Sequence, residues 1–218
     1  MLFRRKSTNP VGTTGSLQSD STAADERSCP TLAKALKKLE SLEHPHILDL
    51  GPFCGSSAVA LADRGARVSV ESFAPPEPPI ERDKREDDTP VEIPFKIEQP
   101  DGSCDLVLAW ESIDFTHPKR LAEVVTEFKR ILAPGGQLLL LSRNATGGHV
   151  RKTVEESMGR FRVKADDRVV RENSGQPTRT RWVHPTREIE RLLKPLSVQG
   201  IHLQRDQTRE ILALHKAP

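Results

Sequence analysis

The order of apolar and polar residues predicts alternating strands and helices along most of the chain. Short apolar runs between turn residues predict strands at 46–50, 67–71, 104–110 and 137–141. Apolar residues that recur every three or four positions predict helices at 30–42, 56–64 and 118–132. The pattern is clearest in the third of these helices, where Pro118 occupies the first position and an apolar stripe runs from Leu121 to Leu132.

Three other segments lack this regular pattern. Residues 1–27 are rich in Ser, Thr, Gly and Asp without an apolar period, which predicts a disordered tail. Residues 74–94 combine several prolines with a charged run and predict a loop, followed by a weak strand at 94–97. Residues 161–170 and 180–183 predict the two strands of a hairpin, because a turn-rich segment separates them.

The end of the chain completes the expected fold. A helix is predicted at 186–193, and two strands at 197–203 and 210–215 should pair antiparallel because their link is short. A βα series of this kind predicts an α/β fold: a Rossmann-like doubly wound sheet, mostly parallel, with a C-terminal antiparallel hairpin and helices on both faces. A length of 218 residues makes one domain the default expectation.

Composition narrows the cellular context. No apolar run approaches the roughly 20 residues of a membrane span, and the basic N-terminus has no apolar segment behind it, so we expect no membrane helix and no signal peptide. Cys29, Cys54 and Cys104 match no zinc motif, and their odd number argues against a disulfide framework. We therefore expect a cytoplasmic protein with reduced cysteines and no metal site.

Charge is unevenly distributed along the chain. Residues 1–142 carry 17 basic and 22 acidic side chains, whereas residues 143–218 carry 16 basic and 9 acidic ones. A basic C-terminal third suits an acidic substrate or a nucleic acid, but equally a solvated arginine-rich surface. The chain has no tyrosine and few other aromatic residues, which disfavours base stacking. Arginines between Arg160 and Arg181 are expected to form an exposed basic face over the ligand cleft.

The predicted strand ends suggest a nucleoside site. In open α/β sheets, ligands bind beyond the carboxyl ends of the strands. Gly51 directly follows the first strand of the series, and Glu71 ends the next strand 20 residues later, a spacing that suits small residues for a cofactor chain and a carboxylate for ribose hydroxyls. The glycine pattern of dinucleotide-binding proteins and the lysine of the P-loop are both absent.

Four motifs in order resemble class I S-adenosylmethionine-dependent methyltransferases: Ile47-Leu-Asp-Leu-Gly51, Glu71, the segment 100–109 (PDGSCDLVLA) and the segment 128–136 (FKRILAPGG). The resemblance implies a methyltransferase-like domain at 28–218, with 161–183 as a hairpin insertion, and S-adenosylmethionine as the cofactor. It assigns cofactor contacts to the turn after the first strand, to the acid ending the second and to residues ending the fourth. Those positions are Asp49, Gly51, Gly55, Glu71, Ala109 and Trp110.

Three of these positions also have an alternative role that involves no cofactor. Asp49 could act only within the turn by accepting backbone amides, Glu71 could be a solvated charge, and Trp110 could be a core aromatic. Phe53 stands where the family usually has a second glycine, so its side chain should point away from the cofactor. The acid that commonly holds adenine has only Glu98 as its nearest counterpart.

The sequence does not identify the methyl acceptor. If the acceptor needs a general base, Glu111, Asp114 and His117 are the nearest candidates, since they follow the fourth strand. The leading hypothesis is a methyltransferase acting on a small-molecule substrate. The alternatives are a nucleic-acid methyltransferase and a non-catalytic binding module with the same fold.

Overall fold

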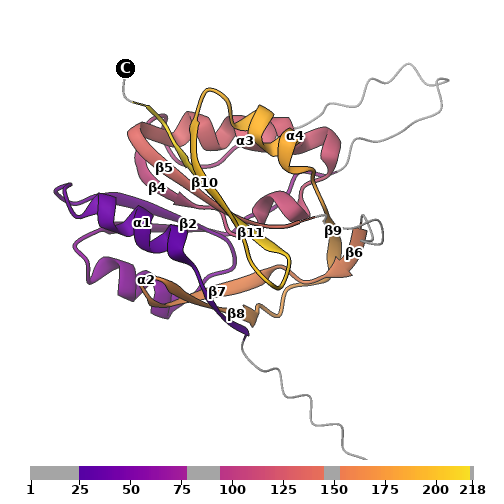
Figure 1. Ribbon diagram of the computed structural model, residues 1–218, viewed down its shortest axis with the longest axis horizontal. Coiled ribbons are helices and arrows are strands. Elements are labelled where there is room, and N and C mark those ends of the chain that lie inside the picture. The colour runs from indigo at the N-terminus through magenta and orange to yellow at the C-terminus, as the bar shows by residue number, and fades with distance from the viewer. Residues whose placement is uncertain (1–24, 78–93, 145–152, 217–218) are drawn as a thin grey trace, which may run out of the picture.

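A computed structural model describes residues 25–77, 94–144 and 153–216 of the chain (Figure 1). Its centre is a six-stranded sheet in the order β10-β11-β5-β4-β2-β3. The strands are β2 (His46–Leu50), β3 (Arg67–Glu71), β4 (Cys104–Leu108), β5 (Leu132–Arg143), β10 (Ser197–Leu203) and β11 (Thr208–Leu214). Strands β2 to β5 pair in parallel, and β11 pairs antiparallel with both β5 and β10. The predicted α/β architecture, mostly parallel with an antiparallel C-terminal hairpin, is confirmed.

Helices cover both faces of this sheet, as Figure 1 shows. The helical elements are α1 (Pro30–Leu39), α2 (Gly55–Ala62), η1 (Ser112–Phe115), η2 (Pro118–Arg120), α3 (Leu121–Ile131) and α4 (Thr186–Leu193). Helices α3 and α4 enclose one apolar core, and α1 and α2 enclose the other. Helices α1 and α2 end a few residues earlier than the sequence predicts. No helix in the described ranges is long and apolar enough to span a bilayer.

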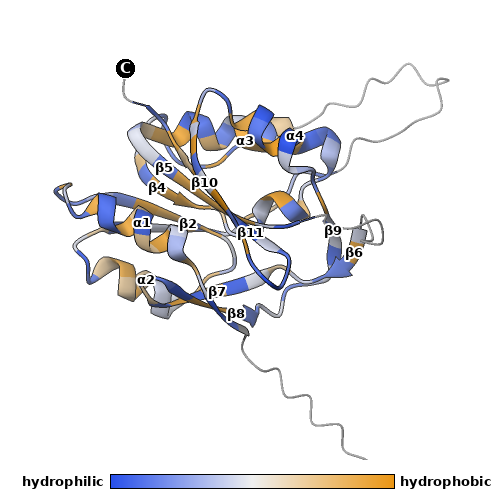
Figure 2. Cartoon of the chain, in the orientation of Figure 1, coloured by the Kyte–Doolittle hydropathy of each residue, from blue (hydrophilic) through white to orange (hydrophobic). Residues whose placement is uncertain are grey.

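The central strands are apolar on both faces because both faces are buried. In β5, Leu138 and Leu140 enter the core under α3, whereas Leu139 and Leu141 enter the core under α1. Alternate residues of a strand point to opposite faces, so a continuous apolar run is what a doubly covered strand requires. Figure 2 shows the consequence, with hydrophobic strands inside and hydrophilic residues on the outer faces of the helices.

Two small sheets lie beside the main one. The first has the order β1-β8-β7, with β1 (Asp25–Ser28), β7 (Gly159–Ala165) and β8 (Arg168–Asn173). The second pairs β6 (Thr153–Glu156) with β9 (Arg179–Trp182). These sheets bring the C-terminal third of the chain over the carboxyl ends of the central strands.

The small sheets correct two predictions. The hairpin of 161–170 with 180–183 is wrong: residues 161–170 contain their own turn at Asp166 and Asp167, and residues 179–182 pair with 153–156 instead. The tail boundary at residue 27 is also wrong, because residues 25–28 pair with β8. That strand has no apolar alternation to reveal it and is held by backbone pairing with residues far along the chain. Residues 1–24 lie outside the described part.

The weak strand predicted at 94–97 does not form. The backbone N–H groups of Phe95 and Ile97 donate to the carboxylates of Glu123 and Glu127 on α3, the latter at 2.9 Å. Side chains of a helix therefore satisfy this backbone in place of a neighbouring strand. The predicted loop at 74–94 lies mostly outside the described residues.

Candidate active site

The carboxyl ends of β2, β3 and β4 meet at one edge of the sheet. The Gly51 N–H donates to the backbone carbonyl of Glu71 at 3.0 Å, which draws the turn after β2 against the end of β3. Ala109 and Trp110 continue directly from β4 and are bonded through their backbone to β5. The residues that the sequence predicted as cofactor contacts are thus brought to one region by the sheet itself.

Glu71 has an unused acceptor at this edge. Its Oε1 accepts a hydrogen bond from the Glu98 N–H at 3.2 Å. Its Oε2 is buried, and no donor among the described residues reaches it. A buried carboxylate oxygen without a partner costs free energy, so it suits a donor that arrives with a ligand. A ribose hydroxyl supplies such a donor, and this end of the site therefore fits a nucleoside cofactor.

The side chain of Asp49 is hydrogen-bonded to Trp110. Its carboxylate is buried and accepts the indole N–H at 2.6 Å. Burial raises the pKa of Asp49 to about 6, although the bond from Trp110 acts in the opposite direction. A Cβ at Gly51 would lie only 3.3 Å from the Trp110 ring, so the glycine makes room for the indole. Asp49 and Gly51 therefore position Trp110.

Strand β7 covers Trp110 from outside the main sheet. The Phe161 ring stacks on the indole with centroids 4.8 Å apart and planes 8° apart. Ser57, fully buried at the start of α2, holds this strand in place: its hydroxyl donates to the Phe161 carbonyl at 2.9 Å and accepts the Val163 N–H at 2.8 Å. The side chains of Ala109 and Trp110 thus face packed protein, and Trp110 is a core aromatic here.

A buried charge network lies behind the site. Arg181 contacts the carboxylates of Glu111 at 2.9 Å, Asp114 at 2.8 Å and Glu156 at 3.1 Å. Arg171 adds a second contact to Glu111 at 2.9 Å and one to Glu156 at 2.8 Å. The network ties η1 to β6, β8 and β9 and fixes both small sheets to the end of β4.

The contacts of this network exclude two of the three candidate residues, Glu111 and Asp114, from the role of general base. Burial raises the pKa of Glu111, but Arg181 and Arg171 outweigh burial and lower it below its usual value. Burial raises the pKa of Asp114, and Arg181 opposes that rise. Because both side chains are buried and bonded to arginine, Glu111 and Asp114 hold structure together and do not open onto a substrate.

The expected exposed arginine face over the cleft forms only in part. Arg181 is buried, with only 5% of its side chain exposed. Arg160 and Arg162 share Glu172 at 2.9 and 2.7 Å. Likewise Arg168 bonds Glu26 at 3.1 Å. These four arginines and Arg171 have carboxylate partners, whereas Arg179 is exposed and no carboxylate among the described residues pairs with it.

Two adjoining hollows open beside Glu71. The first, about 200 Å³, starts at the residue after Glu71 and is lined by Ser72, Phe73, Ala74, Pro75, Met158, Gln176, Pro177 and Arg179. The second, about 360 Å³, is lined by Pro75, Pro76, Glu77, Phe115, His117, Glu155, Arg179, Thr180 and Trp182. Because Pro75 and Arg179 line both, we treat the hollows as one feature, the rim trough.

Comparison with known proteins identifies the family. The family model described as a methyltransferase domain matches residues 22–195. The chain belongs to this methyltransferase family. The predicted membership of the S-adenosylmethionine-dependent methyltransferases is thereby confirmed, and S-adenosylmethionine is the cofactor. A search of curated proteins found no significant match.

Solved structures show the same fold at low identity. A methyltransferase from Mesorhizobium loti, described as S-adenosylmethionine-dependent, aligns with 12% identity and a TM-score of 0.50, over 83% of this chain and 96% of that one. One with the same description from Clostridium acetobutylicum aligns with 10% identity and a TM-score of 0.50, over 88% and 93% of the two chains. At this identity the likeness concerns the fold alone.

Phe53 departs from the glycine expected in the methyltransferase turn. Its side chain is 65% exposed, and its ring lies 3.4 Å from where a Cβ of Gly55 would be. The ring thus folds over the start of α2 and does not fill the buried side of the turn.

His117, the third candidate base, lines the rim trough. Its Nδ1 accepts the Lys119 N–H at 3.2 Å, so the neutral ring carries its proton on Nε2. The ring meets Trp182 edge-to-face with centroids 4.8 Å apart. A neutral His117 in this tautomer donates a hydrogen bond from Nε2 and cannot accept a proton there.

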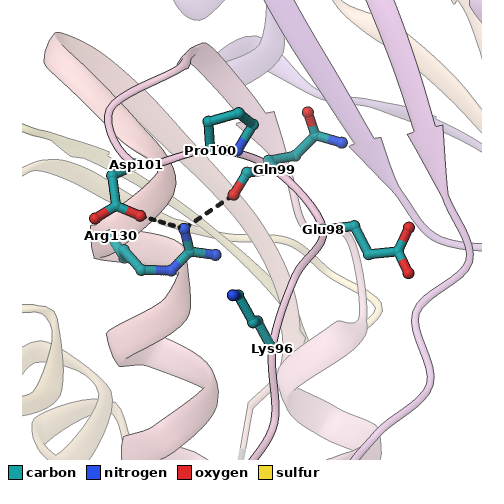
Figure 3. Close-up of a pocket in the computed structure, with 6 residues that line it drawn as sticks. All are labelled: Lys96, Glu98, Gln99, Pro100, Asp101 and Arg130. Carbon is teal, nitrogen blue, oxygen red and sulfur yellow. Dashed lines mark hydrogen bonds and ion pairs between the residues drawn. The ribbon is translucent and has the colours of Figure 1, made fainter.

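A third hollow, of about 460 Å³, lies between α3 and the segment before β4 (Figure 3). Arg130 bonds Asp101 at 2.6 Å across it, and the side chain of Glu98 points away from that pair. Glu98 thus reaches Glu71 through its backbone, while its own side chain is exposed. Among the described residues, no cluster of His, Cys, Asp and Glu could hold a metal.

Proposed function

We propose that this methyltransferase transfers the methyl group of S-adenosylmethionine to a small-molecule acceptor that occupies the rim trough. The observation that carries the proposal is the unpartnered Oε2 of Glu71, in a strand whose following residue, Ser72, lines a trough of small-molecule size. A ligand held through its ribose at Glu71 has the trough as its neighbour, because Ser72 begins the first hollow.

Each predicted cofactor residue receives a distinct role in this proposal. Glu71 accepts hydrogen bonds from the ribose hydroxyls. The turn from Gly51 to Gly55 lies next to the methionine part, as the family resemblance implies. Asp49 acts indirectly, since it orients Trp110. Ala109 and Trp110 form the floor of the site through their backbone and packing.

Methyl transfer depends more on aligning the acceptor atom with the methyl group than on acid–base catalysis. The cofactor supplies a methyl group on a positively charged sulfur, which is already electrophilic. Holding an acceptor atom in line with that group can lower the barrier by about 7–11 kcal/mol. The contribution of this chain is therefore a rigid trough: Phe115 and Trp182 form walls, and the Arg181 network fixes η1 and β9 against each other. His117 serves as a positioning residue that donates from Nε2.

Charge pairing favours a small acceptor over a nucleic acid. Non-specific nucleic-acid binding needs several unpaired cations on one face. In the basic C-terminal third, Arg160, Arg162, Arg168, Arg171 and Arg181 contact carboxylates, so their charges are already compensated. Hollows of this size also suit a compact ligand better than a polymer.

The proposal can be tested with methyl-tritiated S-adenosylmethionine. The full chain is incubated with a cell extract divided into a filtrate below about 1 kDa, a nucleic-acid fraction and a protein fraction. Enzyme-dependent label in the filtrate, reduced by Glu71→Ala, supports the proposal. Label confined to nucleic acid or protein contradicts a small-molecule acceptor, and no transfer to any fraction contradicts the assignment of activity. Glu98→Ala serves as a control, because it removes a nearby exposed carboxylate and should leave labelling intact.

A further inference from the structure

Several aromatic and proline side chains line the rim trough. Phe115, Trp182 and the ring of His117 line one hollow, and Phe73 and Met158 line the other. Prolines from the segment after β3 add to this lining, and Pro75 belongs to both hollows. Rigid aromatic and proline surfaces bury flat apolar ligands at little cost in side-chain entropy. These side chains therefore suit a planar ring system.

Among the described residues that line the trough, Arg179 is the one lysine or arginine, and it lines both hollows. It lies two residues before Arg181 on β9, so both side chains leave the strand on the same face. Arg181 is occupied by Glu111 and Asp114, but no carboxylate among the described residues pairs with Arg179. Its cross-strand neighbour Glu156 already contacts Arg171 and Arg181. An uncompensated guanidinium thus faces the trough.

The acidic residues of the trough limit where negative charge can sit. Glu77 and Glu155 line only the second hollow, and Glu155 accepts the Thr180 hydroxyl at 2.6 Å. None of the described residues that line the first hollow is acidic. An anion is therefore favoured where the two hollows join at Arg179 and disfavoured farther into the second hollow.

We infer that the methyl acceptor is a planar aromatic molecule carrying one anionic group, a carboxylate or a phosphate, which Arg179 binds where the two hollows meet. This inference rests on the proposed function, because it takes the trough as the acceptor site. Arginine suits this role because its planar fork forms two parallel hydrogen bonds with either anion. Arg179 is in this view a specificity residue for the acceptor and has no part in holding the cofactor.

The test compares matched probes on the full chain saturated with S-adenosylhomocysteine. The probes are 4-hydroxybenzoate, phenyl phosphate and the neutral 4-hydroxybenzamide. Trp182 is one of two tryptophans in the chain, and the other, Trp110, is buried. Binding in the trough should therefore quench the fluorescence of Trp182, and Trp182→Phe should abolish the signal change.

We expect at least one anionic probe to bind about five- to tenfold more tightly than the amide. Whichever of the two anions binds better identifies the anionic group. Arg179→Ala should remove the preference, Arg179→Lys should keep part of it, and Arg205→Ala, which removes an exposed arginine outside the trough, should leave it unchanged. Equal affinities of all three probes, no detectable binding of any, or an unaltered preference in Arg179→Ala would overturn the inference.

Calorimetry with S-adenosylhomocysteine on the same variants separates this inference from the proposed function. Arg179→Ala should bind the cofactor product as tightly as the wild type. A loss of that affinity would show that Arg179 contacts the cofactor, contradicting its role toward the acceptor. If the wild type binds the product but does not discriminate among the probes, only the acceptor class is refuted. If the wild type does not bind the product, the proposed function fails as well.

Discussion

Replacing Arg181 with methionine should destabilise the fold strongly, because three carboxylates share this one buried cation. The guanidinium lies 2.8–3.1 Å from oxygens of Glu111, Asp114 and Glu156. Methionine keeps much of the side-chain volume but leaves Asp114 as a buried acid without a cation, and leaves Glu111 with Arg171 as its remaining arginine partner. Removing one partner from a buried ion pair typically costs about 3–5 kcal/mol. For a chain of this size that corresponds to a melting temperature lower by roughly 6–20 °C.

The effect should depend on pH in a defined direction. In the folded protein the pKa of Glu111 is lowered, so its contribution to stability is present above its unfolded pKa and is lost as the pH falls through the folded value. Without Arg181, the pKa of Asp114, already raised by burial, rises further, and the pKa of Glu111 rises from its lowered value because Arg171 alone among the arginines still opposes burial. The variant therefore loses stability relative to the wild type as the pH rises from acid to neutral. The difference between wild type and variant should therefore be large at pH 7 and shrink towards pH 4.

Urea unfolding followed by circular dichroism at several pH values measures this difference. Arg160→Met is a matched control, since Arg160 is about 39% exposed and its pair with Glu172 should contribute only about 0–1 kcal/mol. An Arg181→Met variant that differs from the wild type by no more than this control, or by the same amount at every pH, would refute the reasoning.

Three further predictions concern other parts of the fold. Ser57→Ala should lower the free energy of unfolding by about 1–3 kcal/mol in urea titrations, because two buried backbone groups of β7 lose their hydrogen-bond partner. A change near zero would mean that these two hydrogen bonds do not hold β7 in place. A chain starting at residue 29 should melt lower than one starting at residue 25, since only the former lacks β1, and equal melting temperatures would argue against the pairing with β8. Asp49→Asn should gain stability relative to the wild type as the pH rises from 4 to 7. The wild type loses stability while Asp49 ionises with its pKa raised from 3.8 to about 6, so the gain should reach up to about 3 kcal/mol, and a pH-independent difference would contradict the burial argument.

The main sheet was predictable because its signals are local. Residues 138–141 of β5 are a continuous apolar run, β2 and β4 are mostly apolar, and the helical segment after β4 has an apolar stripe with proline at its start. A parallel sheet covered on both faces demands these patterns. The order of these strands and helices was enough to predict that Gly51 and Glu71 lie at the same edge of the sheet.

The two small sheets were not predictable from local patterns. Strand β1 is polar throughout, and its partner β8 lies more than 140 residues away in the chain. Strand β9 pairs with β6. This short segment is mostly polar, so its sequence shows no apolar alternation that would predict a strand. Their positions depend on charges that meet only in the folded protein, namely Arg181 and Arg171 with Glu111 and Glu156.

The same reason explains which site residues the sequence missed. Ionisable residues after β4 were expected to act as bases because sequence position alone cannot show that Glu111 and Asp114 are enclosed by arginine. Trp182 was overlooked as a lining residue, because β9 was assigned to the wrong hairpin. Arg179 was expected only as one of a group of exposed arginines over the cleft, and the sequence could not show that Arg181 on the same strand is buried and paired while Arg179 is exposed.

The most direct test of the cofactor site is calorimetric titration of S-adenosylhomocysteine into wild-type, Glu71→Ala, Glu71→Gln and Glu98→Ala proteins at one salt concentration. Hydrogen bonds to a charged group contribute about 1.5–3 kcal/mol each, so losing one from the Glu71 carboxylate should weaken binding roughly 10- to 150-fold. Glu71→Gln should fall between wild type and Glu71→Ala, and Glu98→Ala, which removes the same charge from an exposed neighbour, should bind like the wild type. Equal affinities of wild type and Glu71→Ala would contradict the assignment of Glu71 to the ribose.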